Sequence, residues 1–159
     1  FRDCINNLRA GGFFEPLLHQ VDAGNPLLGF CFGMQMLFDE CEYFGRHQGL
    51  GLLPVRVVQF PPGMQVGGEQ LKVPHMGWNN LLIKQPAPIF EGTPDGSFVY
   101  FVHSYYCAAD DPADVAATCR YGDVEFCAAV WRDNLMATQF HPEKSQTIGL
   151  NIFDKFGKL

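Results

Sequence analysis

The sequence predicts an α/β domain whose sheet carries an antiparallel extension, and three features of the chain support this. In the early part, segments of helical periodicity alternate with short apolar runs that are typical of strands. The later part is rich in strands, two of which are joined by the tight turn Gly122-Asp123. Between them, the segment around Gly29-Phe30-Cys31-Phe32-Gly33 has the pattern strand, sharp turn, helix.

The elements of the first half follow from periodicity and from glycine and proline. In the first helix, Ile5 and Leu8 share one face, and Gly11-Gly12 ends the periodicity. Gly24-Asn25-Pro26 separates the second helix from the apolar run that precedes the sharp turn. The expected elements are helices over residues 2–9, about 14–22 and 34–42, and strands over 26–28 and 55–60.

The second half of the chain predicts mainly strands. Residues 67–80 are polar and contain several glycines, so we assign no helix or strand to them. The hairpin around Gly122-Asp123 joins two apolar runs, and the turn at 132–134 leads into a further one. The expected elements are strands over residues 81–84, 97–102, 115–121, 125–131 and 135–140, and a helix over 148–156.

Bulk composition limits the classes of function. At 159 residues, with 47% hydrophobic residues, the chain suits one globular domain with a single core. The formal net charge of −6 argues against nucleic acid and against an anionic membrane as partners, and no apolar run approaches the length of a membrane span. The six cysteines lack a Cys-x-x-Cys pair, and the five histidines lack ligand spacing, so we expect reduced thiols, a cytoplasmic protein, no metal and no cofactor.

Cys31 is the strongest candidate for a nucleophile. A cysteine on a turn between a strand and a helix stands clear of the backbone, and Gly29 and Gly33 provide steric room for such a turn. The positive end of the helix dipole is expected to lower the thiol pKa. The alternative is a buried structural cysteine, because free cysteine packs as a small apolar residue.

A partner for this thiol lies near the C-terminus. Pro142 disfavours the helical region for His141, so the strand that ends there should keep an extended backbone. Residues i and i+2 of an extended chain project to the same side, which places the carboxylate of Glu143 beside the imidazole. Cys31, His141 and Glu143 therefore predict a Cys-His-Glu triad, against the alternative of a solvated His-Pro-Glu turn.

These motifs resemble those of the class I (triad) glutamine amidotransferases, which cleave glutamine through a cysteinyl thioester and pass the ammonia to a synthase. Three further segments resemble the amidotransferase subunits of imidazole glycerol phosphate synthase, a histidine-biosynthesis enzyme. They are residues 49–54 (GLGLLP), 74–79 (PHMGWN) and 100–106 (YFVHSYY). The resemblance covers nearly the whole chain. It implies a flavodoxin-like, mixed and mostly parallel sheet flanked by helices, with the antiparallel extension described above.

The resemblance also implies roles for residues outside the triad. Those expected to bind glutamine are Gln35, Ser104 and Tyr105, and the backbone N–H of Phe32 is the expected oxyanion donor. His75, Trp78 and Asn79 match a segment that faces the synthase subunit. Three of these assignments have a structural alternative. Gln35 could be an exposed helix residue, residues 104–105 could be a strand end with a core tyrosine, and Trp78 could be packed on a surface loop.

The expected partner is the (β/α)8 cyclase subunit, in a heterodimer. Relatives begin with a strand, a helix and a second strand before the point that matches Phe1, and a glycine-rich loop there supplies a second oxyanion N–H. We therefore expect residues 1–159 to be one amidotransferase domain that lacks its N-terminal segment.

Two other functions remain open at this stage. The first keeps the chemistry but changes the pathway, as in an amidotransferase for anthranilate or guanylate synthesis or a free-standing γ-glutamyl hydrolase; the segment 75–79 argues against it. The second is a catalytically silent module that regulates a partner. The complete triad argues against that, and the expected lack of the glycine-rich oxyanion loop argues for it.

Overall fold

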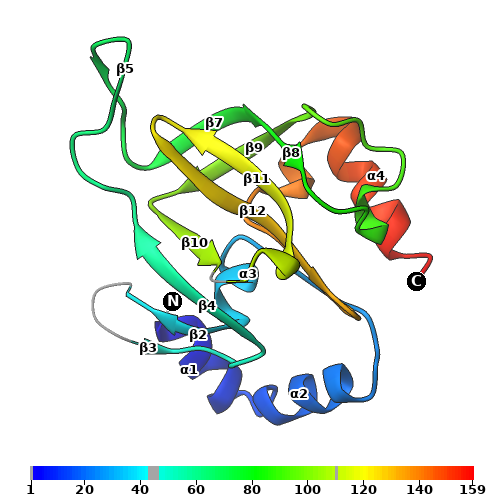
Figure 1. The fold of residues 1–159 in the computed structure, drawn as a ribbon. Helices are drawn as coiled ribbons and strands as arrows, with labels where there is room; N and C mark the ends of the chain where they lie inside the picture. Colours follow the sequence, from blue (N-terminus) through cyan, green and yellow to red (C-terminus); the bar gives the residue numbers. More distant parts are fainter. Residues whose placement is uncertain (1, 43–46, 110) are drawn as a thin grey trace.

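A nine-stranded mixed sheet forms the centre of the computed structural model, which describes residues 2–42, 47–109 and 111–159. Its strand order is β1-β13-β12-β10-β4-β2-β3, with β11 beside β12 and β8 beside β11 (Figure 1). The strands are β1 (Leu27–Phe30), β2 (Phe38–Cys41), β3 (His47–Gln48), β4 (Leu53–Gln59), β8 (Leu82–Ile83), β10 (Tyr105–Ala109), β11 (Val115–Tyr121), β12 (Val124–Arg132) and β13 (Leu135–Thr138).

The sheet combines parallel and antiparallel pairings. β1 runs parallel to β13 and β2 runs parallel to β4, whereas the other pairings of this sheet among the described residues are antiparallel. The α/β class, the mixed sheet and its antiparallel extension are thus confirmed. Fewer of the strand pairings are parallel than expected, because the short turns between β11, β12 and β13 can join only antiparallel neighbours.

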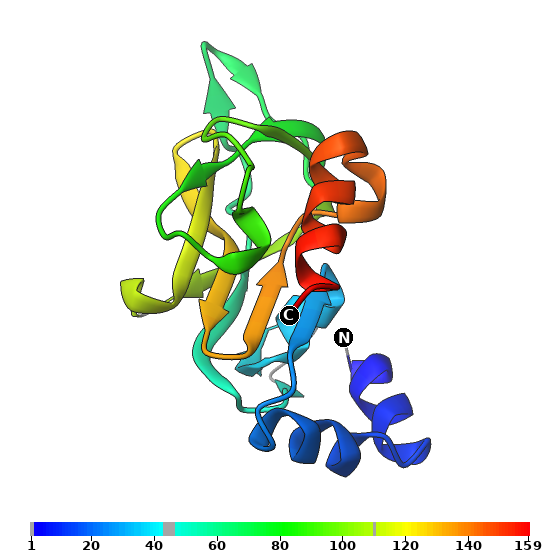
Figure 2. The ribbon, with the colours of Figure 1, turned by 90° about the vertical axis from the view of Figure 1, so that its right-hand side faces the viewer.

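Helices lie at the edges of this sheet. α1 (Arg2–Ala10) and α2 (Phe14–Asp22) lie at one end, close to the expected positions, and α4 (Gln146–Phe156) lies beside β1 (Figure 2). There the rings of Phe153 and Phe30 meet edge to face, with centroids 6.2 Å apart. Short 3-10 turns complete the helical elements: η1 (Pro88–Phe90), η2 (Pro112–Asp114) and η3 (Pro142–Lys144).

The helix expected over residues 34–42 is wrong. α3 spans only Phe32–Met36, and the chain then enters β2. The carbonyl groups of Met36 and Phe38 accept hydrogen bonds from Leu50 (2.7 Å) and Gly51 (3.4 Å), so they are not available to helical N–H groups. Gly49 makes this approach possible, since a Cβ atom there would lie 2.1 Å from the carbonyl oxygen of Phe38.

A second small sheet was not predicted from the sequence. β7 (His75–Asn80) pairs antiparallel with β9 (Phe98–His103), and His75 lies opposite His103. β7 falls in the stretch 67–80, to which no element was assigned. A half-buried strand is expected to have apolar residues on its inner side, but in β7 the apolar Met76 and Trp78 face outward and the polar His75 faces inward. A further two-stranded hairpin, β5 (Gln65–Val66) with β6 (Glu69–Gln70), occupies the same stretch.

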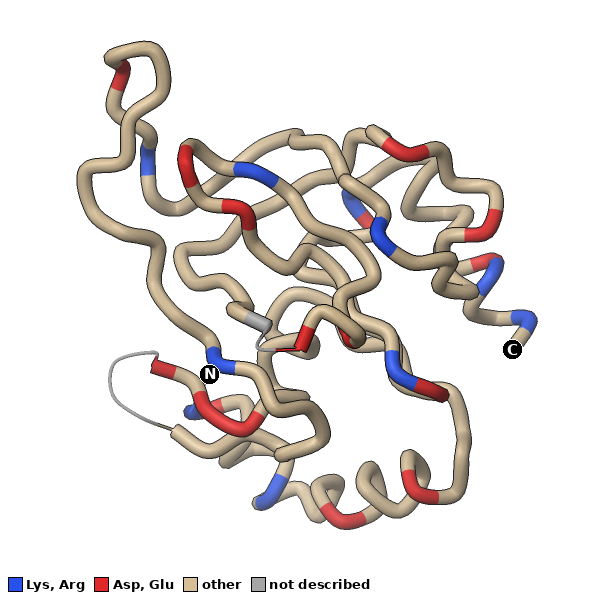
Figure 3. Tube along the Cα trace, in the orientation of Figure 1, with Lys and Arg blue, Asp and Glu red and all other residues tan. Residues whose placement is uncertain are grey.

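Lys and Arg residues are interspersed with Asp and Glu residues along the described chain (Figure 3). The core consists of two apolar clusters. Phe60, Phe101 and Phe126 belong to one, and Met34 and Phe38 belong to the other. Among the described residues, no helix has the length and apolar character that a membrane crossing requires.

Candidate active site

Cys31 occupies a strained turn between β1 and α3. Its backbone has φ 53° and ψ −115°, a region that non-glycine residues rarely adopt and that is found at functional turns. Gly29 allows the turn to close, because a Cβ atom there would lie 2.8 Å from the carbonyl oxygen of Gly33. A Cβ atom on Gly33 itself would meet no atom within 4 Å, so the expected steric role holds for Gly29 and not for Gly33.

The parallel pairing of β1 with β13 brings the cysteine and histidine segments together. Phe30 lies opposite Thr138, and the N–H of Cys31 donates to the Thr138 carbonyl at 2.9 Å. His141 follows three residues after Thr138, so both segments leave the sheet at the same carboxyl edge. This is where ligands bind on open α/β sheets, as the sequence predicts.

His141 and Glu143 are in direct contact. Nδ1 of His141 lies 2.7 Å from Oε1 of Glu143, and His141 has the extended backbone expected before proline, with φ −97° and ψ 101°. Glu143 lies in η3 rather than in extended chain, so a 3-10 turn, and not strand alternation, aligns the pair. The carboxylate can only accept, so Nδ1 carries the proton and Nε2 presents its lone pair. Nε2 is buried and has no hydrogen-bond partner among the described residues.

Two residues that sequence reasoning missed hold this histidine. The hydroxyl of Ser145 donates to the His141 carbonyl at 2.7 Å and accepts from the N–H of Tyr100 at 3.0 Å. Gly149 on α4 lies against Pro142 so closely that a Cβ atom would fall 1.7 Å from the Pro142 carbonyl oxygen. A small residue one helical turn after Ser145 was the only signal in the sequence for this close approach.

Burial of the Cys31 thiol outweighs the effect of the adjacent helix on its pKa. Burial raises its pKa above 9.0, and the nearby Glu143 carboxylate raises it further, whereas the N–H of Phe32 and the Lys144 ammonium lower it. The expected lowering by the helix dipole is therefore outweighed, because α3 has only five residues and the sulfur is largely withdrawn from water. A base is needed to take the proton.

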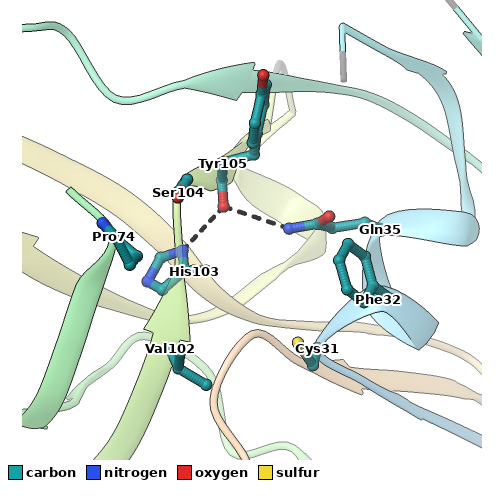
Figure 4. A pocket seen from close by; sticks show the side chains of 8 residues that line it. All are labelled: Cys31, Phe32, Gln35, Pro74, Val102, His103, Ser104 and Tyr105. Atoms are coloured by element: carbon teal, nitrogen blue, oxygen red, sulfur yellow. Dashed lines mark hydrogen bonds between the residues drawn. The ribbon is translucent and has the colours of Figure 1, made fainter. Parts of the chain in front are cut away.

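A pocket of about 210 Å³ opens beside this cysteine (Figure 4). Its walls come from the turn at Cys31, from α3, from the end of β9 and from the start of β10. The lining residues are Cys31, Phe32, Gln35, Pro74, Val102, His103, Ser104 and Tyr105. The pocket thus gathers the predicted nucleophile, the predicted oxyanion residue and the three predicted substrate-binding residues.

Gln35 is buried at this pocket, with 2% of its surface exposed, which rules out the exposed alternative. Its Nε2 donates to the carbonyl of Tyr105 at 3.2 Å and to Oε1 of Gln139 at 3.0 Å. The Oε1 of Gln35 and the Nε2 of Gln139 are buried without a partner among the described residues. This buried pair of side-chain amides therefore keeps one unpaired acceptor, on Gln35, and one unpaired donor, on Gln139. Gln139 was not predicted from the sequence as a site residue.

Ser104 and Phe32 contribute through the backbone. The Ser104 carbonyl accepts from the N–H of Phe60 at 3.1 Å, which ties the junction of β9 and β10 to the end of β4. The backbone N–H of Phe32 lowers the pKa of the Cys31 thiol, against the larger effect of burial.

The three residues expected to face a partner separate in the structure. Trp78 is 46% exposed and packs edge to face on Tyr100, with centroids 5.9 Å apart. His75 is only 3% exposed, and the half-buried Asn79 lies on the same side of β7, where it donates to the Arg120 carbonyl at 2.8 Å. Strand alternation explains the error, because neighbouring residues of β7 face opposite sides; Met76, two residues from Trp78, shares its exposed side.

Comparison with known proteins assigns this site to a family. The sequence model described as "Glutamine amidotransferase class-I" matches residues 7–158. The chain is 61% identical over 159 residues to the imidazole glycerol phosphate synthase subunit HisH of Syntrophotalea carbinolica and 57% identical over 159 residues to that of Geobacter sulfurreducens. The chain belongs to the class-I glutamine amidotransferases. It covers 77% and 76% of these two relatives and is itself covered completely by both matches.

The fold of this class-I amidotransferase also matches solved structures. A crystal structure described as a glutamine amidotransferase superposes with a TM-score of 0.65 over 94% of this chain and 71% of the other, at 19% sequence identity. This likeness concerns the fold alone. Within the described part of the amidotransferase, no group of three or more His, Cys, Asp or Glu side chains has an arrangement that could hold a metal ion.

Proposed function

We propose that this chain is the glutaminase subunit of an imidazole glycerol phosphate synthase. It hydrolyses glutamine to glutamate and ammonia through a cysteinyl thioester, and supplies the ammonia to a cyclase subunit in histidine biosynthesis. The hydrogen bond of 2.7 Å between His141 and Glu143, beside the strained turn of Cys31, carries the proposal. The identities to two HisH subunits support the choice of pathway.

The reaction follows from the state of the three side chains. Because Glu143 fixes the proton on Nδ1 of His141, Nε2 is available to remove the proton of the Cys31 thiol, whose pKa is raised by burial. The sulfur attacks the carboxamide carbon of glutamine, and the histidine returns the proton to the departing ammonia. A water molecule, deprotonated by the same Nε2, then attacks the thioester carbonyl; glutamate is released, and the proton passes from Nε2 to the departing sulfur to restore the Cys31 thiol.

Binding and charge stabilisation come from the pocket walls. Phe32 follows the nucleophile directly, so its backbone N–H can donate to the carbonyl oxygen that becomes negatively charged in the tetrahedral intermediate. Gln35 lines the pocket on one side, and Ser104 and Tyr105 line it on another. We therefore assign these four residues to the binding of glutamine and of its tetrahedral intermediate.

The partner is proposed to dock on the exposed side of β7. Trp78 and Met76 present apolar surface there, and aromatic residues are enriched among the contacts that dominate interface energies. The partner is a (β/α)8 cyclase, in a heterodimer. We treat residues 1–159 as belonging to one amidotransferase domain, because the family match spans residues 7–158. The free thiols of all six cysteines suit a reducing, cytoplasmic location.

The decisive experiment measures glutamine hydrolysis by the complete protein, alone and with its cyclase partner and nucleotide. We expect strong activation in the complex and no activity in Cys31→Ala or Cys31→Ser, both of which should bind the cyclase like the wild type. Retained hydrolysis in either variant would contradict the triad. Equal activity with and without the cyclase would instead favour a free-standing hydrolase.

A further inference from the structure

Two buried histidines outside the triad form a hydrogen-bonded pair next to the pocket. His75 and His103 lie opposite each other on β7 and β9, with 3% and 6% of their surfaces exposed. Nδ1 of His75 lies 2.9 Å from Nε2 of His103. Aromatic rings surround both: Tyr121 stacks on His75 at 4.0 Å between centroids, and Phe126 lies 5.0 Å from His103. Polar rings in so apolar a place carry a desolvation cost that calls for a reason.

The proton on each ring is fixed by its neighbour. Nδ1 of His103 lies 2.8 Å from the carbonyl oxygen of Tyr105, which can only accept, so Nδ1 is the donor. Nε2 of His103 must then accept, and the proton of the contact between the histidines belongs to Nδ1 of His75. Nε2 of His75 in turn accepts from the side-chain amide of Asn79 at 3.3 Å. Both rings are therefore neutral tautomers protonated at Nδ1.

The two rings keep these tautomers at neutral pH. Burial lowers the pKa of His75 to about 4 and that of His103 to about 3, so neither ring gains a second proton near pH 7. The chain of donors runs in one direction, from Asn79 through both rings to Tyr105. It is fully satisfied at every nitrogen, which is the condition under which a buried polar network makes a structure rigid.

The chain ends on a wall of the pocket. The Tyr105 carbonyl accepts from His103 at 2.8 Å and from Nε2 of Gln35 at 3.2 Å, so both of its lone pairs are used (Figure 4). Its other end lies on β7, where Asn79 follows the exposed Trp78. One network thus joins β7, whose opposite side carries Trp78, to the amide proposed to bind glutamine.

We propose that His103 and His75 are positioning residues for glutamine binding. They hold the Tyr105 carbonyl, and through it the Gln35 amide, in place at the wall of the pocket. They also tie this orientation to β7, so that a cyclase seated on Trp78, on the opposite side of this strand, acts on the pocket through the strand and this network. The inference rests on the proposed glutaminase function.

Substitutions at residue 103 separate the hydrogen bond from the volume of the ring. In His103→Asn, the side-chain amide nitrogen takes nearly the place of Nδ1 and can still donate to Tyr105, whereas His103→Phe fills the space without a donor. We expect His103→Phe to raise the KM for glutamine roughly tenfold, with kcat changed less than threefold, as the loss of one net hydrogen bond would do. His103→Asn should recover most of this loss, despite being smaller. His75→Phe should raise the KM to a lesser degree and reduce activation by the cyclase.

A matched variant controls for packing. Phe126→Leu alters the same aromatic cluster without touching a polar atom of the chain, so it should lower the thermal midpoint and leave the KM unchanged. An equal rise in KM in Phe126→Leu, or a wild-type KM in His103→Phe, would overturn the inference while the activity of the wild type still supports the proposed function. A wild type without glutaminase activity would instead overturn that function.

Nitrogen-15 NMR of the imidazole rings provides a readout that does not depend on activity. Between pH 5 and 8, His75 and His103 should each show a protonated Nδ1 and an unprotonated Nε2, without titrating. An Nε2–H tautomer at either ring, or titration of either ring in this range, would overturn the inference. His103→Asn should leave the His75 ring without its acceptor and change its nitrogen shifts.

Discussion

At the scale of single residues, the site combines a nucleophile that is hard to ionise with a base that is held ready. Burial raises the pKa of the Cys31 thiol, so this residue is mostly protonated at neutral pH. The structure compensates at His141, whose ring is oriented by Glu143 and whose carbonyl is held by Ser145. The thiolate is then formed only as the proton is transferred, which makes the orientation of the histidine more important than the resting charge of the sulfur.

The first prediction concerns this orientation. Glu143→Gln removes the carboxylate that fixes the Nδ1–H tautomer, and its amide nitrogen can present a donor to Nδ1 and favour the wrong tautomer. We expect kcat for glutamine hydrolysis to fall on the order of a thousandfold, with a small change in stability because Glu143 is 42% exposed. Steady-state kinetics and thermal unfolding of the variant in complex with the cyclase measure both quantities.

An exposed glutamate elsewhere serves as the control. Glu91 accepts a hydrogen bond from the ammonium of Lys155 at 2.9 Å, far from the catalytic residues in the sequence, and Glu91→Gln removes the same charge. It should leave kcat at the wild-type value. A similar loss in both variants would mean that net charge, and not the tautomer of His141, sets the rate.

The residue scale also shows what could be predicted from the sequence. The positions of Cys31 and His141 follow from local signals, namely glycines around one and proline after the other, and the structure places both as expected. The inward orientation of His75 depends on the alignment of β7 with β9, which no local signal specifies. The roles of Gln139 and Ser145 depend on contacts with residues 104 and 45 positions away, Gln35 and Tyr100, and these exist only after folding.

At the scale of elements, the elbow depends on backbone contact between β1 and α3. Gly29 and Gly33 lie two residues before and after Cys31 and look equivalent in the sequence. Their surroundings differ. A Cβ atom added to Gly29 would collide with the Gly33 carbonyl, whereas a Cβ atom added to Gly33 would meet no atom within 4 Å. The strained backbone of Cys31 is thus maintained by one glycine and not by both.

The second prediction tests this asymmetry. In Gly29→Ala, the new methyl group would lie 2.8 Å from the carbonyl oxygen of Gly33, so the turn must open and displace the sulfur. We expect a drop in kcat of at least a hundredfold and a lower thermal midpoint, since a misplacement of about 1 Å can have such an effect on rate. Gly33→Ala is the matched variant, and it should keep the fold and most of the activity. Equal losses in the two variants would contradict the assignment.

The elements that sequence reasoning missed share a cause. β7 and β10 were not predicted, and residues 38–41 were expected to be helical, yet each forms a strand through pairing with a distant segment. In β2, the carbonyls that would close a helix instead accept from residues 49–53. Local propensity is a weak guide where distant backbone partners compete for the same groups, whereas helices with a clear apolar face, such as α2, were predicted well.

At the scale of the whole molecule, buried titratable groups define the pH range in which the protein is most stable. Burial raises the pKa of Cys119 and Cys127 to about 12, so their ionisation opposes folding as the pH rises above 9.0. Burial lowers the pKa of His75 and His103, so their protonation opposes folding as the pH falls below 6.5. Both effects weaken the fold away from neutrality, and stability should be greatest between these two values.

The third prediction concerns the loss of stability at acidic pH. Below pH 6.5 the unfolded chain binds protons at His75 and His103 that the folded chain does not bind until about pH 4 and about pH 3. The free energy of unfolding should therefore fall by up to about 1.4 kcal/mol per pH unit for each histidine in this window. Glu125, whose pKa is lowered to about 2 by hydrogen bonds from Thr118, Arg120 and Lys84, acts only below its ordinary value of 4.5 and does not obscure the effect. Urea unfolding at pH 7.5, 6.0 and 5.0 measures the slope, which should flatten in the double variant His75→Phe/His103→Phe. A wild type equally stable at pH 7.5 and 5.0 would show that these rings are not buried as neutral groups.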